Sequence, residues 1–265
     1  MTDKDREELR RARELLESPG LAARLSNLAG APVEAALRRL PEGLRDGVGK
    51  AARKALEGAL NTALKTMDAA CPAERPSKDR LHKACATAAG GLGGLFGASG
   101  LLVELPVTTT IMLRSIADIA RCNGEDLSLP EARLACLEVF ALGGSRADDD
   151  AAETGYFAVR ASLTKAVTDA ARYVAAGMGL AEQGAPVLVR LMAMIARRFG
   201  VTVSQKLAAQ AVPVIGALGG AAVNSVFMEH FQNMARGHFA VRRLERAHGR
   251  EAVRRAWQGL GEQAA

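Results

Sequence analysis

A glycine-rich run between residues 90 and 100, which holds six glycines, could cradle a phosphate group on its backbone. A P-loop also needs a lysine and a hydroxyl at fixed spacing, but no lysine occurs between Lys83 and Lys165. A dinucleotide-binding loop that used Gly91 and Gly93 would need a third glycine where Phe96 stands. The run therefore matches neither kind of nucleotide-binding loop.

Three other patterns could support catalysis or bind a metal ion, but each is incomplete. The stretch "GASGL" around Ser99 is similar to the nucleophile elbow of hydrolases, although Leu101 replaces its last glycine. His82 and Cys85 offer only two zinc ligands. The run Asp148–Asp150 could bind a hard cation, but its position after "LGGSRA" favours capping of a helix start. We therefore expect a protein without a catalytic residue, metal or cofactor. The alternative is that the protein is a hydrolase of unknown substrate.

The chain shows helical periodicity throughout and no alternation of β-branched residues, so it predicts an all-α fold. We expect a charged helical N-terminal arm of residues 1–34, a single multi-helix domain of residues 35–248 and a basic C-terminal tail helix of residues 249–265. After a polar linker, the pattern predicts helices over about 101–122, 130–142, 150–177, 185–212 and 222–247.

A basic amphipathic helix is expected over Asp46–Met67, where aliphatic residues recur every four positions beside Lys50, Arg53 and Lys54. The spacing favours a core-packing helix with a solvated Lys/Arg face. Docking of the same helix on a membrane surface is the alternative.

Two central segments, residues 84–103 and 207–228, each run for about 20 residues without a charge, which is the length that a transmembrane helix needs. Their Gly, Ala and polar content supplies little driving force for membrane insertion, so we do not expect transmembrane helices. Glycines at small-xxx-small spacing, including Gly93 and Gly97, would let helix backbones touch. We interpret both segments as apolar, glycine-rich helix-packing surfaces.

Helical spacing after Pro106 separates an apolar face from a polar one. The apolar face holds Leu105, Met112, Leu113, Ile116 and Ile119, and the polar face holds Glu104, Thr108, Ser115 and Asp118. Arg114 stands four residues before Asp118, which predicts either a solvated ion pair or the polar rim of a pocket.

The net charge of +6 permits attraction to an anionic partner. The arginines of "RRLERAHGREAVRRAW" have only Trp257 to stack on a base, so we expect no nucleic acid and favour a solvated helix face, followed by an anionic membrane surface. The four cysteines have no CxxC spacing and predict small, buried, reduced thiols. The charged start "MTDKDREELRRARELLES" does not read as a signal peptide, so we expect a cytoplasmic protein, peripheral at the inner face of the cell membrane.

Several separated blocks resemble the EcsC family of bacterial proteins over roughly residues 35–248. They are "LHKACATAAGGLGGLFGASGLLVELPVTTTIMLRSIADIARCNGED", "RLACLEVFALGG", "ETGYFAVRASLTKAV" and "VPVIGALGGAAVNSVFMEHFQNMARGHF". The resemblance implies a helical, partly hydrophobic protein whose family takes its name from a gene beside an ABC transporter, and it implies no established reaction or cofactor. Some members are labelled peptidases or hydrolases, but no protease motif occurs here.

Polar residues in the matching blocks are the candidates for a site, as an internal network that orients the helices or as a head-group site. With the two glycines, the candidate ligand-binding residues are Gly93, Gly97, Glu104, Thr108, Arg114, Asp118, Tyr156, Arg160, Asn224, Glu229 and His230. We expect a non-catalytic protein that contacts membranes reversibly and binds a lipid or other apolar ligand between its glycine-rich segments. An accessory protein of a membrane transporter is a second alternative.

Overall fold

The computed structural model describes residues 1–17, 20–30, 32–66, 79–94, 97–143, 155–177, 186–210 and 216–262. Side chains are not described for residues 45, 64–66, 79–80, 89–94, 97–103, 216–218 and 261–262. In the described ranges the chain forms eleven helices and no strand, which confirms the prediction of an all-α single domain. The helices are α1 (Asp3–Glu17), α2 (Leu21–Ala29), α3 (Val33–Arg38), α4 (Glu42–Thr66), α5 (Asp79–Gly94), α6 (Gly97–Cys122), α7 (Pro130–Leu142), α8 (Gly155–Ala175), α9 (Pro186–Gln210), α10 (Gly216–His248) and α11 (Arg250–Glu262).

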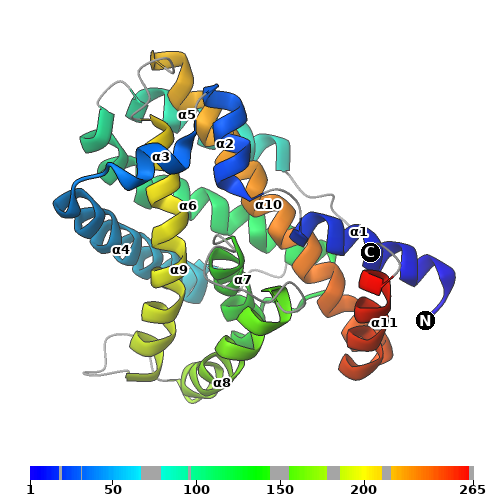
Figure 1. Cartoon of the computed structure of the whole chain (residues 1–265). Helices are drawn as coiled ribbons and strands as arrows, with labels where there is room; N and C mark the ends of the chain where they lie inside the picture. The colour runs from blue at the N-terminus through cyan, green and yellow to red at the C-terminus, as the bar shows by residue number, and fades with distance from the viewer. Residues whose placement is uncertain are drawn as a thin grey trace.

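The longest helix, α10, runs through the molecule and is contacted by helices from both ends of the chain (Figure 1). Phe231 on α10 lies 5.4 Å from the ring of Phe140 on α7 and 5.7 Å from that of Phe199 on α9. Aromatic pairs at such distances add to the free energy gained by burial alone. Few aromatic residues are present, and several of them meet at this junction of α7, α9 and α10.

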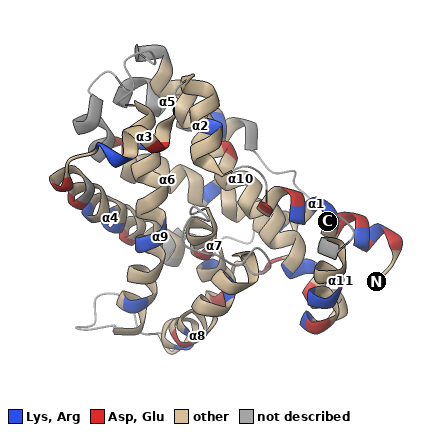
Figure 2. Cartoon of the chain, in the orientation of Figure 1, with Lys and Arg blue, Asp and Glu red and all other residues tan. Residues whose placement is uncertain are grey.

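The expected basic amphipathic helix is present as α4, which is four residues longer at its start than predicted. Its apolar stripe, including Ala52, Leu56 and Leu60, is fully buried, whereas Lys50 and Lys54 are exposed. The interpretation as a core-packing helix with a solvated face is therefore confirmed. Figure 2 shows that the Lys and Arg residues on α4 are interspersed with acidic ones.

The glycine-rich segment 84–103 is divided between α5, which ends at Gly94, and α6, which begins at Gly97. On α5, Lys83 binds Glu229 and the Ala86 carbonyl accepts a hydrogen bond from Asn224, so α5 and α10 run antiparallel. The glycine-rich end of α5 and the start of α10 therefore lie at the same end of the domain. The predicted close contacts of Gly93 and Gly97 lie outside the described side chains.

The first and last described helices, α1 and α11, pack against α10 and against each other (Figure 1). Trp257 of α11 is 4% exposed and stacks on Tyr156 of α8 with ring centroids 5.5 Å apart. Arg13 of α1 donates a hydrogen bond of 3.0 Å to the Trp257 carbonyl. Between α10 and α11, Gly249 has a φ of +85°, which glycine adopts without strain and which lets α11 fold back.

The expectation of buried cysteines is wrong for two of the three that the structure describes. Cys136 on α7 is buried, but Cys85 on α5 and Cys122 at the end of α6 are exposed. Cys85 and Cys122 lie on the solvent-facing sides of their helices. The small, apolar side chain of a cysteine does not by itself show which side of a helix it occupies. Cys71 lies outside the described residues.

Candidate functional site

The first polar cluster lies in the core, where α5, α6, α9 and α10 meet. Lys206 on α9 is fully buried, and its ammonium group lies 2.7 Å from Oε1 of Glu104 on α6. Asn224 on α10 donates from its side-chain amide to the same Glu104 oxygen at 2.6 Å and to the Ala86 carbonyl at 2.8 Å. We call Glu104, Lys206 and Asn224 the core cluster. One carboxylate oxygen of Glu104 joins α6 to α9 and α10, and Asn224 joins α10 to α5.

Burial and pairing act in opposite directions on the Lys206 ammonium. Burial lowers the pKa of Lys206 because it disfavours the charged form, and the Glu104 carboxylate opposes this shift. The ammonium also lies 5.0 Å from the ring centroid of Phe227, close enough for a cation–π contact. These contacts offset part of the cost of placing a cation in the core.

The core cluster is not fully satisfied within the described part of the chain. Neither Oε2 of Glu104 nor Oδ1 of Asn224 has a hydrogen-bond partner there, and both atoms are buried. A buried acceptor without a partner costs about 1–3 kcal/mol. Both atoms are hydrogen-bond acceptors, so a molecule that binds to them must bring N–H or O–H donors.

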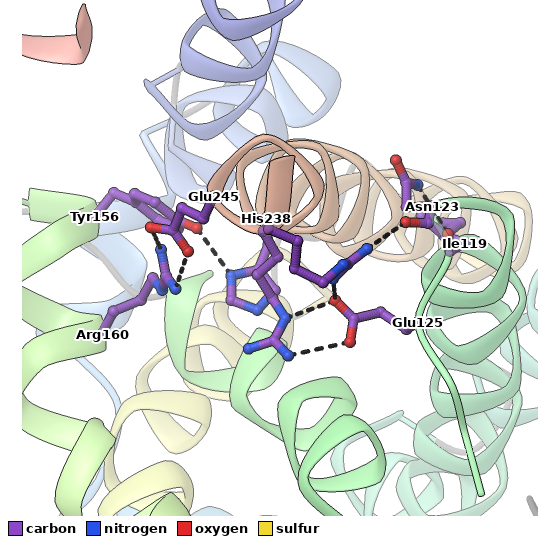
Figure 3. A network of polar contacts seen from close by, with 9 residues as sticks. Ile119, Asn123, Glu125, Tyr156, Arg160, His238 and Glu245 are labelled. Carbon is purple, nitrogen blue, oxygen red and sulfur yellow. Dashed lines mark hydrogen bonds and ion pairs between the residues drawn. The ribbon is translucent and has the colours of Figure 1, made fainter. Parts of the chain in front are cut away.

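The second polar cluster lies at the other end of α10 and includes two of the predicted residues, Tyr156 and Arg160 (Figure 3). Arg160 on α8 binds Glu245 on α10 through two bonds of 2.9 and 2.8 Å. The Tyr156 hydroxyl lies 3.0 Å from Nδ1 of His238, which is fully buried. Burial and nearby arginines lower the pKa of His238 well below its usual value, so the ring that hydrogen-bonds to the Tyr156 hydroxyl is neutral.

Across α10 from this pair, Arg242 binds Glu125 through bonds of 2.8 and 3.1 Å. Arg246 also bonds Glu125, and its second nitrogen donates to the Asn123 carbonyl at 2.6 Å (Figure 3). The sequence predicts that Arg242 and Arg246 belong to a basic, solvated helix face. Instead, they hold the loop after α6 against α10, because Glu125 supplies the opposite charge.

A cleft opens beside this second cluster, between α7, α8, α10 and α11. It has a volume of about 460 Å³ and is lined by residues that include Glu138, Phe157, Arg160, Arg242, Arg250 and Arg254. Glu138 on α7 is only 5% exposed, and burial raises its pKa to about 7 although Arg160 and Arg242 favour the charged form. We call this space the α7–α11 cleft. A smaller hollow of about 310 Å³ adjoins it and shares Arg242, Glu245 and Arg250.

The predicted site residues do not converge on one place. Glu104 and Asn224 meet in the core cluster, and Thr108 lies one turn after Glu104, with its hydroxyl bonded to the backbone at 3.2 Å. Tyr156 and Arg160 belong to the second cluster. His230 is buried, and its Nε2 lies 3.0 Å from the Gly143 carbonyl near the end of α7.

The remaining predicted residues lie nearer the surface. Glu229 binds Arg24 at 2.8 Å and Lys83 at 2.7 Å, which fixes α2 and α5 to α10. Asp118 lies 3.0 Å from Nε2 of His82, and Arg114 is exposed. The side chain of Ser99 and the whole of Asp148–Asp150 lie outside the described residues, as do the contacts of Gly93 and Gly97.

No three His, Cys, Asp or Glu side chains converge closely enough to hold a metal ion in the part of the chain that the structure describes. Among the same residues, no helix is both long and apolar enough to cross a membrane.

The segments that carry both clusters are covered almost completely by one family signature. The family model of the EcsC protein family matches residues 3–244. The chain belongs to the EcsC family. The matched range includes α1, whereas the sequence resemblance was expected to begin near residue 35 and its first quoted block begins at Leu81. No curated protein and no solved structure matches this EcsC-family chain.

Sequence reasoning missed Lys206 in this EcsC-family chain, although a signal for it exists. Glu104 is the only charged residue between Lys83 and Arg114, and Lys206 is the only one between Arg198 and Glu229. Lone opposite charges in two long uncharged runs are stable in a core only when they pair. Glu138 offers no comparable signal, because a single glutamate in α7 reads as an ordinary exposed helix residue.

Proposed function

We propose that this EcsC-family protein is a non-catalytic binding protein that associates reversibly with anionic membranes and holds an apolar or lipid-like ligand at the core cluster. The Glu104 carboxylate supports the ligand proposal. One of its oxygens binds Lys206 and Asn224, and the other has no partner among the described residues. A polar head that carries N–H or O–H groups would satisfy it.

The place of the core cluster also supports this proposal. It lies toward the end of the domain where α5 finishes and α10 begins, both with glycine-rich sequence. Glycine in a helix interior costs about 1 kcal/mol relative to alanine, so such helix ends rearrange more easily than the rest of the domain. An apolar chain could enter there with its polar head toward Glu104.

Membrane contact is proposed through the exposed face of α4. Its apolar stripe is used by the core, and Arg53 pairs with Glu57 at 3.0 Å. Among the described side chains of this helix, Lys50 and Lys54 therefore offer their charges to a bilayer. Each basic residue near an anionic bilayer contributes about 1 kcal/mol, and salt screens this attraction. Association through α4 should therefore be reversible and sensitive to salt.

Native mass spectrometry of gently purified protein tests the ligand. We expect a mass increment that corresponds to a lipid and disappears on denaturation. Wild-type protein that carries no adduct after purification, and acquires none from added lipid, would contradict the ligand proposal.

Sedimentation with anionic vesicles tests the membrane contact. We expect Lys50→Glu/Lys54→Glu to reduce binding at least about tenfold. The matched control is Lys165→Glu/Arg172→Glu, which makes the same change of net charge on exposed positions of α8. Equal losses in both double variants would mean that net charge, and not α4, governs binding.

A further inference from the structure

Two arginines in the α7–α11 cleft form no direct ion pair with a carboxylate in the described part of the chain. Arg160 and Arg242 also line the cleft, but each is held by a glutamate through two bonds. Arg250 and Arg254, on the first turns of α11, are exposed and line the same cleft. They are therefore available to an anion that enters from solvent, and the left-handed turn at Gly249 places them there.

Opposite these arginines lies a buried carboxyl group that makes no hydrogen bond to the described residues. Glu138 lines the cleft and is more than nine-tenths buried. The charged groups that act on it are Arg160 from α8, Arg242 and Glu245 from α10, and Arg250 from α11. Because burial raises its pKa to about 7, the Glu138 carboxyl is partly protonated near neutral pH.

A protonated carboxyl changes what the cleft can bind. It donates a hydrogen bond to an anion, whereas a carboxylate at the same place would repel one. Guanidinium groups match phosphate oxygens in geometry and charge, and a phosphate monoester has three terminal oxygens to share among three donors. The volume of about 460 Å³ exceeds what one phosphate fills. Phe157, Ala161 and Val167 give part of the remaining wall an apolar surface, and the rest of the lining includes Thr164 and Thr168 and the glutamates Glu131, Glu245 and Glu251.

We propose that the α7–α11 cleft binds the phosphate group of a phosphomonoester, with Arg250 and Arg254 as cationic partners and the Glu138 carboxyl as a third hydrogen-bonding group. Phe157, Ala161 and Val167 face the organic part of the ligand. This site is separate from the core cluster, so it does not depend on the ligand or the membrane contact proposed above.

Calorimetric titration with glycerol 3-phosphate tests the arginines. We expect Arg254→Ala and Arg250→Ala each to weaken binding about tenfold or more at pH 6. Arg255→Ala is the matched control, because Arg255 is an exposed neighbour on α11 that does not line the cleft, and its affinity should stay within about twofold. Equal affinities for Arg254→Ala and Arg255→Ala would overturn the proposal.

Comparison of wild type with Glu138→Gln at pH 6 and pH 8 tests the proton. The amide donates a hydrogen bond at both pH values, so the ratio of the two affinities removes the effect of the ligand's own ionisation. We expect wild type to lose up to about tenfold in affinity relative to Glu138→Gln, because the Glu138 carboxyl, with a pKa of about 7, loses its proton between pH 6 and pH 8. An unchanged ratio would remove Glu138 from the site.

The phosphate could belong to a soluble molecule or to a lipid head group. Vesicles that contain phosphatidic acid, a phosphomonoester, are compared with vesicles of phosphatidylglycerol, a phosphodiester. Binding to the first with loss in Arg254→Ala, but no response to glycerol 3-phosphate, assigns the site to a lipid head group. The reverse result assigns it to a soluble phosphomonoester, and failure of both probes at pH 6 would overturn the proposal.

Discussion

Gly237 of α10 lies so close to Leu16 of α1 that a Cβ atom at position 237 would come within 2.6 Å of Leu16 Cγ. The same atom would lie 2.9 Å from the carbonyl oxygen of Ala12, which is backbone and cannot move aside by rotation. The first helix therefore packs on α10 through a position that has room only for hydrogen.

Gly237→Ala should accordingly destabilise the protein. Overpacking costs about 1–3 kcal/mol, and it outweighs the gain of about 1 kcal/mol that alanine brings to a helix interior. Gly200→Ala on α9 is the control, because a Cβ there would meet nothing within 4 Å, and it should stabilise by up to about 1 kcal/mol. Urea unfolding measures both, and equal effects of the two substitutions would contradict this account.

The Lys206–Glu104 pair should show strong coupling in a double-mutant cycle. Lys206→Met alone leaves the Glu104 carboxylate buried without its cation, which costs about 3–5 kcal/mol. Lys206→Met combined with Glu104→Gln removes both charges, so we expect it to be much more stable than the sum of the single changes predicts. Denaturant unfolding of the four proteins gives the coupling, and additive single effects would show that the pair is not a unit.

The sequence predicts the helices well because their periodicity is strong, but it does not predict which polar faces are covered. On α6 the predicted apolar face, from Leu105 to Ile119, is buried as expected. Most of the opposite polar face is buried too, since Thr108 is 1% and Ser115 is 0% exposed, whereas Asp118 is partly exposed. Periodicity separates the two faces of a helix, but the number of neighbours that surround it depends on the whole chain.

The clusters were harder to predict for a related reason. Glu125 and Arg242 are 117 residues apart, and Glu104 and Lys206 are 102 apart, so no local pattern links them. The arginine-rich end of α10 was read as a solvated face because its acidic partners lie on other helices. Composition alone could not distinguish an exposed basic patch from one that is neutralised by distant glutamates.

His230 should make the protein less stable in acid. Burial lowers its pKa to about 4 from 6.5, so the unfolded chain takes up a proton below pH 6.5 while the folded protein does not until about pH 4. Stability therefore falls as pH falls through this window, by about 3 kcal/mol from this residue. In His230→Gln, the amide can still donate to the Gly143 carbonyl. The free energy of unfolding of this variant, measured with urea, should fall less than that of wild type between pH 7 and pH 4. Parallel pH profiles of the two proteins would show that His230 already titrates normally.

Glu138 should act in the opposite direction. Its folded pKa is raised to about 7 from 4.5, so the unfolded chain releases the proton first as pH rises, and the folded protein retains it until about pH 7. The free energy of unfolding of wild type therefore falls by up to about 3 kcal/mol between about pH 4.5 and pH 7. Above that window, Glu138 causes no further loss. Glu138→Gln keeps the size of the side chain and cannot ionise, so its advantage over wild type should be small at pH 4 and reach its maximum near pH 8. Urea unfolding of both proteins, each without added phosphate, measures the difference. An advantage that stays the same from pH 4 to pH 8 would mean that the Glu138 carboxyl is solvated and ionises as it does in the unfolded chain.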